Sequence, residues 1–218
     1  LILAITSALL PIISQKTGLS KKCGFPLKMI CAFAYLLTGL VSSVSYGKLT
    51  DYSLMILVAL IMGILGDFFL EYKTKKYYPA GVVFFALGHI VYSITFLCIG
   101  EYKAITHLAQ AITATVIITA LIFIFAKAVL KLKGKKNMLL IYAPVLVFAF
   151  VCAVIKAVVA ANTGNINFSI SLFSGSLLFF FSDIMIGMGK KRPRILHYAV
   201  SYTYFAAQAL FAISILFQ

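Results

Sequence analysis

Apolar runs separated by short polar breaks make up almost all of this 218-residue sequence, and the length of these runs constrains the fold more than any other feature. A helix needs roughly 20 apolar residues to span a bilayer. Eight candidate runs are present, although the first is short and the chain does not begin with Met, so we expect further residues upstream. The expected helices are Leu1–Ile13, Leu27–Tyr46, Ser53–Leu70, Pro79–Ile99, Ile105–Ala126, Met138–Ala160, Phe168–Met188 and Ile195–Phe217.

The composition agrees with a membrane protein. Hydrophobic residues make up 63% of the chain, charged residues 11%, and the mean hydropathy is +1.07. Soluble domains are usually only about half apolar. The loops between the runs are too short to build a separate core. We therefore expect an all-α, polytopic membrane bundle of about eight transmembrane helices, with residues 1–218 forming a single domain.

The basic residues alternate between the two sides of this expected bundle. Of 19 Lys and Arg residues, sixteen fall on one side and three on the other. The larger group is Lys16, Lys21, Lys22, Lys28, Lys73, Lys75, Lys76, Lys127, Lys131, Lys133, Lys135, Lys136, Lys190, Lys191, Arg192 and Arg194; the smaller is Lys48, Lys103 and Lys156. The positive-inside rule then puts the basic loops in the cytoplasm and both termini outside.

This distribution also bears on partners and location. Basic loops at a membrane surface favour anionic lipid headgroups, so we expect membrane lipids and no nucleic acid as partners. The protein should be integral and multi-pass, in the cell membrane if the source is bacterial. The four cysteines lie at different depths without metal-ligand spacing, and we expect neither a metal nor a cofactor.

Two acidic residues fall inside apolar runs. Asp67 and Asp183 each precede the cytoplasmic end of a helix, and the two helices run in the same direction, so both carboxyl groups lie at similar depth. At 1.5 Å of rise per residue, each sits about 10 Å above the nearest loop lysine. Intramembrane acids usually face the bundle interior and mark a site. The alternative is a protonated Asp that only hydrogen-bonds neighbouring helices.

Other polar residues occupy overlapping depths. His89 lies near the midplane of the fourth run with Tyr92 on nearly the same face. Tyr204 and Gln208 are one turn apart in the last run. Four helices thus carry polar faces that could meet, whereas the remaining Ser, Thr, Asn and single Tyr residues, such as Tyr142, are typical of helix packing.

These residues carry a resemblance. Four segments resemble the successive signatures of the YhhN family of lysoplasmalogenase-like membrane proteins: "LGDFFL", "FFALGHIVY", "SGSLLFFFSDIMIG" and "YFAAQAL". They occur in the same order as in the family and extend over nearly the whole chain. The resemblance implies hydrolysis of the vinyl ether bond of a lysoplasmalogen, a lysophospholipid, to a fatty aldehyde and glycerophosphoethanolamine or glycerophosphocholine.

This reaction calls for an acid and a base, as glycoside hydrolysis does. We therefore expect Asp67 and Asp183 to divide these catalytic roles, in an order that the residues leave open, with His89 positioning or relaying a proton. The substrate-binding residues would be Tyr92, Tyr204 and Gln208, with Lys28 or the loop lysines meeting the phosphate.

Three other classes share some of these features. Intramembrane aspartyl proteases use two Asp residues, but their Gly-x-Gly-Asp element would need Gly at position 65, which is Leu65 here. A proton-coupled transporter of a small or lipid-like substrate could use the same acids, and it is the main alternative. A lipid-binding or scaffold protein would tolerate amide replacement of both acids.

Overall fold

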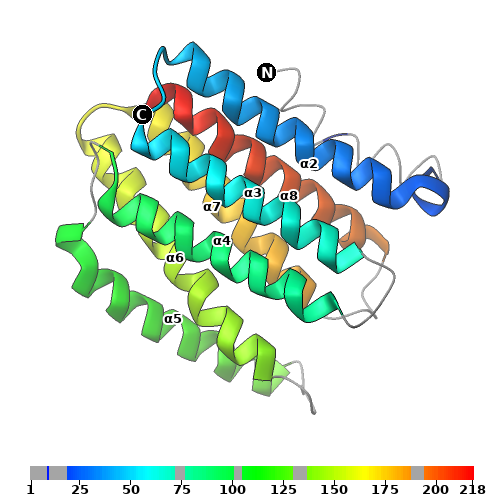
Figure 1. The fold of residues 1–218 in the computed structure, drawn as a ribbon. Helices are drawn as coiled ribbons and strands as arrows, with labels where there is room; N and C mark the ends of the chain where they lie inside the picture. Colours follow the sequence, from blue (N-terminus) through cyan, green and yellow to red (C-terminus); the bar gives the residue numbers. More distant parts are fainter. Residues whose placement is uncertain (1–8, 10–18, 72–76, 101–104, 130–136, 188–193) are drawn as a thin grey trace.

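The computed structural model describes residue 9 and residues 19–71, 77–100, 105–129, 137–187 and 194–218 (Figure 1). The described helices are α2 (Leu19–Ser45), α3 (Asp51–Glu71), α4 (Tyr78–Cys98), α5 (Leu108–Val129), α6 (Asn137–Asn162), α7 (Ile166–Gly187) and α8 (Arg194–Ser214), with short 3-10 helices η2 (Ile105–His107) and η3 (Ile215–Phe217). All seven α-helices are long and apolar enough to cross a membrane. The protein is therefore an integral, multi-pass, all-α membrane bundle.

Seven of the eight predicted runs correspond to these helices. The boundaries of α3, α4, α6 and α7 lie within about two residues of the prediction. Helix α2 begins eight residues before the predicted Leu27, but its apolar span, Phe25–Ser45, agrees with it. The first predicted run, Leu1–Ile13, lies outside the described residues apart from Leu9.

Six of the helices close into a ring. Around it, α2 packs on α3, α3 on α4, α4 on α6, α6 on α7, α7 on α8, and α8 returns to α2 (Figure 1). Because helices far apart in the sequence, such as α2 and α8, lie side by side, the interior receives side chains from both ends of the chain. This closure is what brings the polar faces of α3, α4, α7 and α8 toward one interior.

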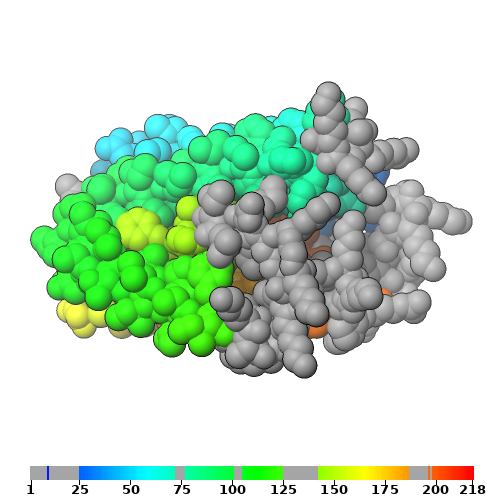
Figure 2. All heavy atoms as spheres, turned by 90° about the horizontal axis from the view of Figure 1, so that it is seen from below, coloured from blue at the N-terminus to red at the C-terminus, as the bar shows by residue number. Residues whose placement is uncertain are grey.

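Helix α5 lies outside the ring. It packs mainly on α6, and most of its apolar side chains from Leu108 to Ile124 are exposed (Figure 2). In a bilayer such a surface faces lipid, where exposed Ile, Val and Leu side chains are favourable.

Short turns close one end of the bundle. Gly47 follows α2 and Gly164 follows α6, each with a φ near +90°, a conformation that costs glycine little and other residues more. The amide of Gly47 donates to the carbonyl of Val44, and that of Gly164 to the carbonyl of Ala161, at 3.0 Å each. These turns explain why α2 and α3, and likewise α6 and α7, pack as antiparallel neighbours.

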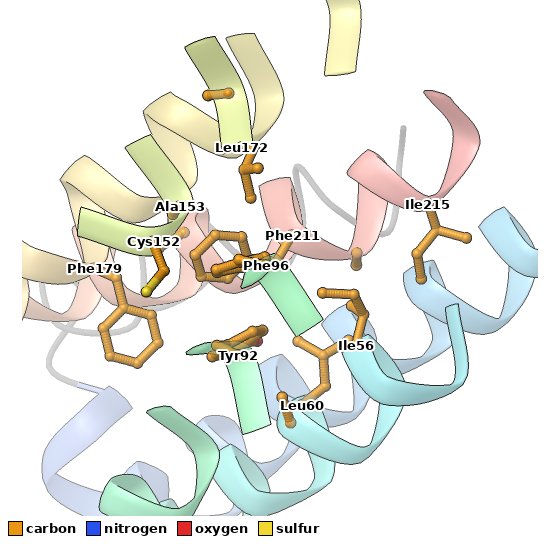
Figure 3. Close-up of a cluster of buried hydrophobic side chains, with 14 of the residues drawn as sticks. Ile56, Leu60, Tyr92, Phe96, Cys152, Ala153, Leu172, Phe179, Phe211 and Ile215 are labelled. Carbon is orange, nitrogen blue, oxygen red and sulfur yellow. The ribbon is translucent and has the colours of Figure 1, made fainter. Parts of the chain in front are cut away.

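The apolar core is rich in aromatic rings. Tyr92 and Phe96 of α4 meet Phe179 of α7 and Phe211 of α8 in one cluster (Figure 3). The ring centroids of Tyr92 and Phe211 are 4.6 Å apart, in the range where aromatic pairs attract.

One lysine counted among the outer basic residues lies inside the bundle. Lys156 of α6 is fully buried, and its Nζ donates to the carbonyl of Ile99 at 2.6 Å, where α4 ends. It also lies 5.4 Å from the ring centroid of Tyr52. A cation at a helix C-terminus is favoured by the helix dipole, so Lys156 ties α6 to the end of α4.

Candidate functional site

Two sets of ionisable and hydrogen-bonding side chains surround the intramembrane aspartates. The first, called here the lysine site, consists of Lys28, Asp67 and Glu71. The second, called the histidine site, consists of His89, Tyr142 and Asp183. Each set contains one of the two intramembrane aspartates that the sequence singles out.

The lysine site links α2 to α3. Lys28 Nζ lies 3.1 Å from Asp67 Oδ1 and 3.5 Å from Glu71 Oε2. The Asp67 side chain is 3% exposed, Lys28 27% and Glu71 44%, so the site runs from the bundle interior to its surface. Asp67 and Glu71 are one helical turn apart, which lets one ammonium group serve both. Within the described residues Asp67 Oδ2 is buried and has no hydrogen-bond partner.

Hydrogen-bonding side chains continue from Asp67 into the bundle. The Tyr204 hydroxyl lies beside Asp67. Gln208 Nε2 donates to Tyr204 Oη at 3.3 Å, and Tyr92 Oη donates to Gln208 Oε1 at 2.7 Å. All these groups are buried, and in a dry interior such bonds matter because an unpaired polar atom is costly.

Gly63 makes this chain of residues possible. A Cβ at position 63 would lie 2.7 Å from Gln208 Nε2, 3.1 Å from Tyr35 Oη and 3.2 Å from Tyr204 Oη. Only a residue without a side chain lets these three polar groups approach the backbone of α3. Gly63 is thus part of the site's construction.

The histidine site joins α4, α6 and α7. His89 Nε2 lies 2.9 Å from Tyr142 Oη and 3.2 Å from Asp183 Oδ2, and the Tyr142 hydroxyl donates to the same Asp183 oxygen. The single hydroxyl proton of Tyr142 is used by Asp183, so His89 Nε2 must carry the proton that lies between it and Tyr142. Among the described residues Nδ1 of His89 makes no hydrogen bond.

Phe179 lies between His89 of the histidine site and Tyr204, which adjoins Asp67. Its ring centroid is 4.7 Å from that of His89 and 5.5 Å from that of Tyr204, and Figure 3 shows it facing the cluster around Tyr92. Asp67 and Asp183 are therefore not a directly bonded pair: no hydrogen bond or ion pair in the described part of the chain joins them.

A small cavity adjoins the histidine site. It is lined by side chains of α4, α6, α7 and α8, among them His89, Tyr92, Phe179 and Ser176, and the other lining residues are mostly apolar. The space open to the centre of a water molecule is about 10 Å³. That volume is about what one water requires.

The predicted residues thus separate into three groupings in the structure. Lys28 lies with Asp67; Tyr92 and Gln208 lie with Tyr204; and His89 lies with Asp183. The sequence did not single out Tyr142, Tyr35 or a partner role for Glu71. The depth of Tyr142, six residues into α6, matches that of Asp183 and is the signal that could have found it.

The arrangement defines a polytopic helical membrane protein with two sets of ionisable residues, each built around a buried aspartate side chain. Residues 24–215, most of the chain, match the model of the YhhN family, and the protein belongs to that family.

One relative extends this comparison. A protein of Dictyostelium discoideum named "Lysoplasmalogenase homolog" is 28% identical over 158 residues, which are 63% of this chain and 50% of the relative. The chain therefore spans about half the length of that protein. A search of solved structures finds no match.

Proposed function

We propose that this protein is a membrane enzyme of lysoplasmalogenase type. It would hydrolyse the vinyl ether of a lysophospholipid to a fatty aldehyde and glycerophosphoethanolamine or glycerophosphocholine. Membership of the YhhN family and the name of the Dictyostelium relative support this class. The observation that carries the proposal is that each of the two buried aspartates has a basic partner, Lys28 for Asp67 and His89 for Asp183.

The chemistry needs one proton to be delivered and one to be removed. Protonation of the alkenyl carbon beta to the ether oxygen breaks the double bond and leaves an oxocarbenium ion. Water adds to that ion and loses a proton, giving a hemiacetal, which collapses to aldehyde and alcohol. One water is consumed and the catalytic proton is returned, so no further reactant is required.

The histidine site suits the proton transfers. In our proposal His89 is protonated on both nitrogens, with Nε2–H held by Asp183 and Tyr142, and Nδ1–H protonates the alkenyl carbon. Neutral His89 then accepts a proton from the attacking water through Nδ1. An ionised Asp183 stabilises the imidazolium and fixes its orientation, as a carboxylate does in hydrolase triads. The adjoining cavity is large enough for that water.

The lysine site suits charge stabilisation. Asp67 lies 3.1 Å from Lys28, whose positive charge opposes the tendency of burial to keep this carboxyl group neutral, and we propose that it is ionised. A fixed negative charge in a water-poor site stabilises a developing cation more strongly than it would in water. In this proposal Asp67 stabilises the oxocarbenium ion, while Tyr92, Tyr204 and Gln208 hold the ether oxygen or the water. The alkenyl chain would lie among the Phe side chains around Phe179.

The test is aldehyde release from a lysoplasmalogen in detergent. Purified wild type is compared with Asp67→Asn, Asp183→Asn and His89→Gln, and with Asp51→Asn as a control, because Asp51 is an exposed acid at the start of α3. We expect the first three variants to fold and to lose about 100-fold or more in rate. The control should keep the wild-type rate.

Two outcomes would overturn parts of the proposal. If wild type is active but a folded Asp67 or Asp183 amide variant keeps its rate, the assigned roles are wrong. If folded wild type releases no aldehyde, the lysoplasmalogenase function is wrong, and proton-coupled transport, which could use the same acids, is the function to test next.

A further inference from the structure

Lys28 is shared by two carboxylates that lie in different surroundings. Asp67 is almost completely buried, whereas the Glu71 side chain is 44% exposed and its Oε2 is the more distant, at 3.5 Å. Breaking a buried ion pair leaves an uncompensated charge and is costly. An exposed ion pair contributes little and exchanges readily with other ions. Glu71 is therefore the exchangeable partner of Lys28.

A ligand that displaces Glu71 from Lys28 must match the charges of the lysine site. If both carboxyl groups are ionised, the site holds one positive and two negative charges, so a simple anion approaching Lys28 meets repulsion from Glu71 and Asp67. A ligand that carries both a phosphate and an amine avoids this repulsion. Its phosphate can replace Glu71 on Lys28 while its ammonium group pairs with the displaced Glu71, and every charge keeps a partner.

Asp67 Oδ2 provides a second observation. It is buried without a hydrogen-bond partner among the described residues, and an ionised carboxylate oxygen can only accept. Buried polar groups normally have partners, and besides the nearby Tyr204 hydroxyl this oxygen can accept from one further donor. A hydroxyl group is the neutral donor that suits an oxygen at this depth.

We propose that the lysine site binds the zwitterionic headgroup of a lysophospholipid. From the surface inward, Glu71 takes the ammonium, Lys28 the phosphate, and Asp67 Oδ2 the free glycerol hydroxyl. This order is the order of the groups along the lipid, so the ether-linked chain follows into the bundle. The inference rests on the proposed function for its orientation, and it adds the residue that selects the headgroup.

Aromatic side chains beside the site are compatible with an ammonium ligand. Phe25 and Phe68 pack edge to face with centroids 5.7 Å apart, and each lies three residues from a member of the lysine site, Lys28 and Glu71 respectively. Aromatic faces attract ammonium groups, including methylated ones. In this proposal ethanolamine and choline headgroups would bind alike.

The test measures binding without turnover. The probes are two saturated 1-O-alkyl lysolipids of equal chain length, which lack the vinyl group; one carries phosphoethanolamine and the other phosphate alone. Each is titrated by calorimetry into detergent-solubilised wild type, Glu71→Gln and the exposed-acid control Asp51→Asn. Glu71→Gln should fold normally because the side chain it changes is half exposed.

We expect wild type and the control to bind the phosphoethanolamine lipid about fivefold more tightly than the phosphate lipid, which corresponds to one surface ion pair. In Glu71→Gln this preference should vanish, because the amine loses its partner and the phosphate loses a repulsive neighbour. A preference that persists in Glu71→Gln, or that is missing in wild type, overturns the headgroup assignment.

A third probe tests whether the glycerol hydroxyl or a water molecule donates to Asp67 Oδ2. A phosphoethanolamine lipid without the glycerol hydroxyl should bind wild type about tenfold more weakly, since hydrogen bonds to charged groups are stronger than neutral ones. Equal binding would mean that water serves Asp67 Oδ2, and the hydroxyl assignment would be wrong.

Failure of this inference can be distinguished from failure of the proposed function. The saturated probes report binding even if the protein releases no aldehyde from a lysoplasmalogen. Aldehyde release with a headgroup preference that ignores Glu71 refutes only the headgroup site. A Glu71-dependent preference without aldehyde release refutes only the hydrolase.

Discussion

The ion pair between Lys28 and Asp67 makes a quantitative prediction about folding. Two unit charges 3.1 Å apart attract by about 5 kcal/mol at an effective dielectric constant of about 20. Much of this attraction offsets the desolvation of the pair, but removal of one partner leaves the other charge buried alone. For Lys28→Met we therefore expect a loss of about 3 kcal/mol in the free energy of unfolding.

The pairing itself is isolated by a double-mutant cycle. The single variants Lys28→Met and Asp67→Asn and the double variant are unfolded by titration with denaturing detergent in mixed micelles. Because the double variant leaves no unpaired buried charge, and Glu71 is half exposed, it should be more stable than Lys28→Met alone, with a coupling energy of about 1–2 kcal/mol or more. The control is Lys48→Met, which removes an exposed lysine and should change stability by less than about 0.5 kcal/mol.

The refuting result is additivity. If the free-energy changes of the two single variants sum to that of the double variant within about 0.5 kcal/mol, the two side chains do not interact in the folded protein. The lysine site would then be an incidental approach of two side chains, and its assigned roles would lose their basis.

Three further predictions concern single contacts. Tyr142→Phe removes the hydroxyl that contacts both His89 and Asp183. It should lower kcat/KM for aldehyde release roughly tenfold, which corresponds to about 1.4 kcal/mol of transition-state stabilisation. An unchanged kcat/KM would contradict the positioning role of Tyr142. Gly63→Ala places a Cβ 2.7 Å from Gln208 Nε2 of α8 and should lower the free energy of unfolding by about 1–3 kcal/mol in the same assay. The control Gly88→Ala places its Cβ 3.4 Å from the nearest atom and should leave this free energy unchanged or raise it by up to about 1 kcal/mol. Equal effects of the two variants would refute the crowding argument. Lys156→Met removes the donor to the Ile99 carbonyl at the end of α4 and should cost about 1–3 kcal/mol, so superimposable unfolding curves would show that this link contributes nothing.

Much of the fold could be predicted because each span is a local property. A run of apolar residues long enough to cross a bilayer must be helical, since its backbone groups have no other partners there. The predicted boundaries of α3 and α6 accordingly lie within about two residues of those observed. The depth of a residue follows from its position along the run, which is why Asp67, His89, Asp183 and Gln208 could be singled out.

The partners of these residues depend on which helices are neighbours, and periodicity does not encode that. The pairing of His89 with Asp183 requires α4 and α7 to meet beside α6, and only the closed ring determines this. The same information was needed to find Tyr142, which by itself is a single tyrosine in an apolar helix. Likewise, the burial of Lys156 could not be foreseen, because a lysine near a helix end usually reaches water.

The most direct measurement of the central claim is the fate of solvent hydrogen during turnover. A lysoplasmalogen is hydrolysed by purified wild type in deuterated water, and the released aldehyde is reduced at once and analysed by mass spectrometry and NMR. Aldehyde incubated with the protein in deuterated water serves as the exchange control. Protonation of the alkenyl carbon predicts one deuterium on the carbon next to the carbonyl, and its appearance should be lost with Asp183→Asn. Aldehyde without that deuterium would contradict the proposed vinyl ether hydrolysis.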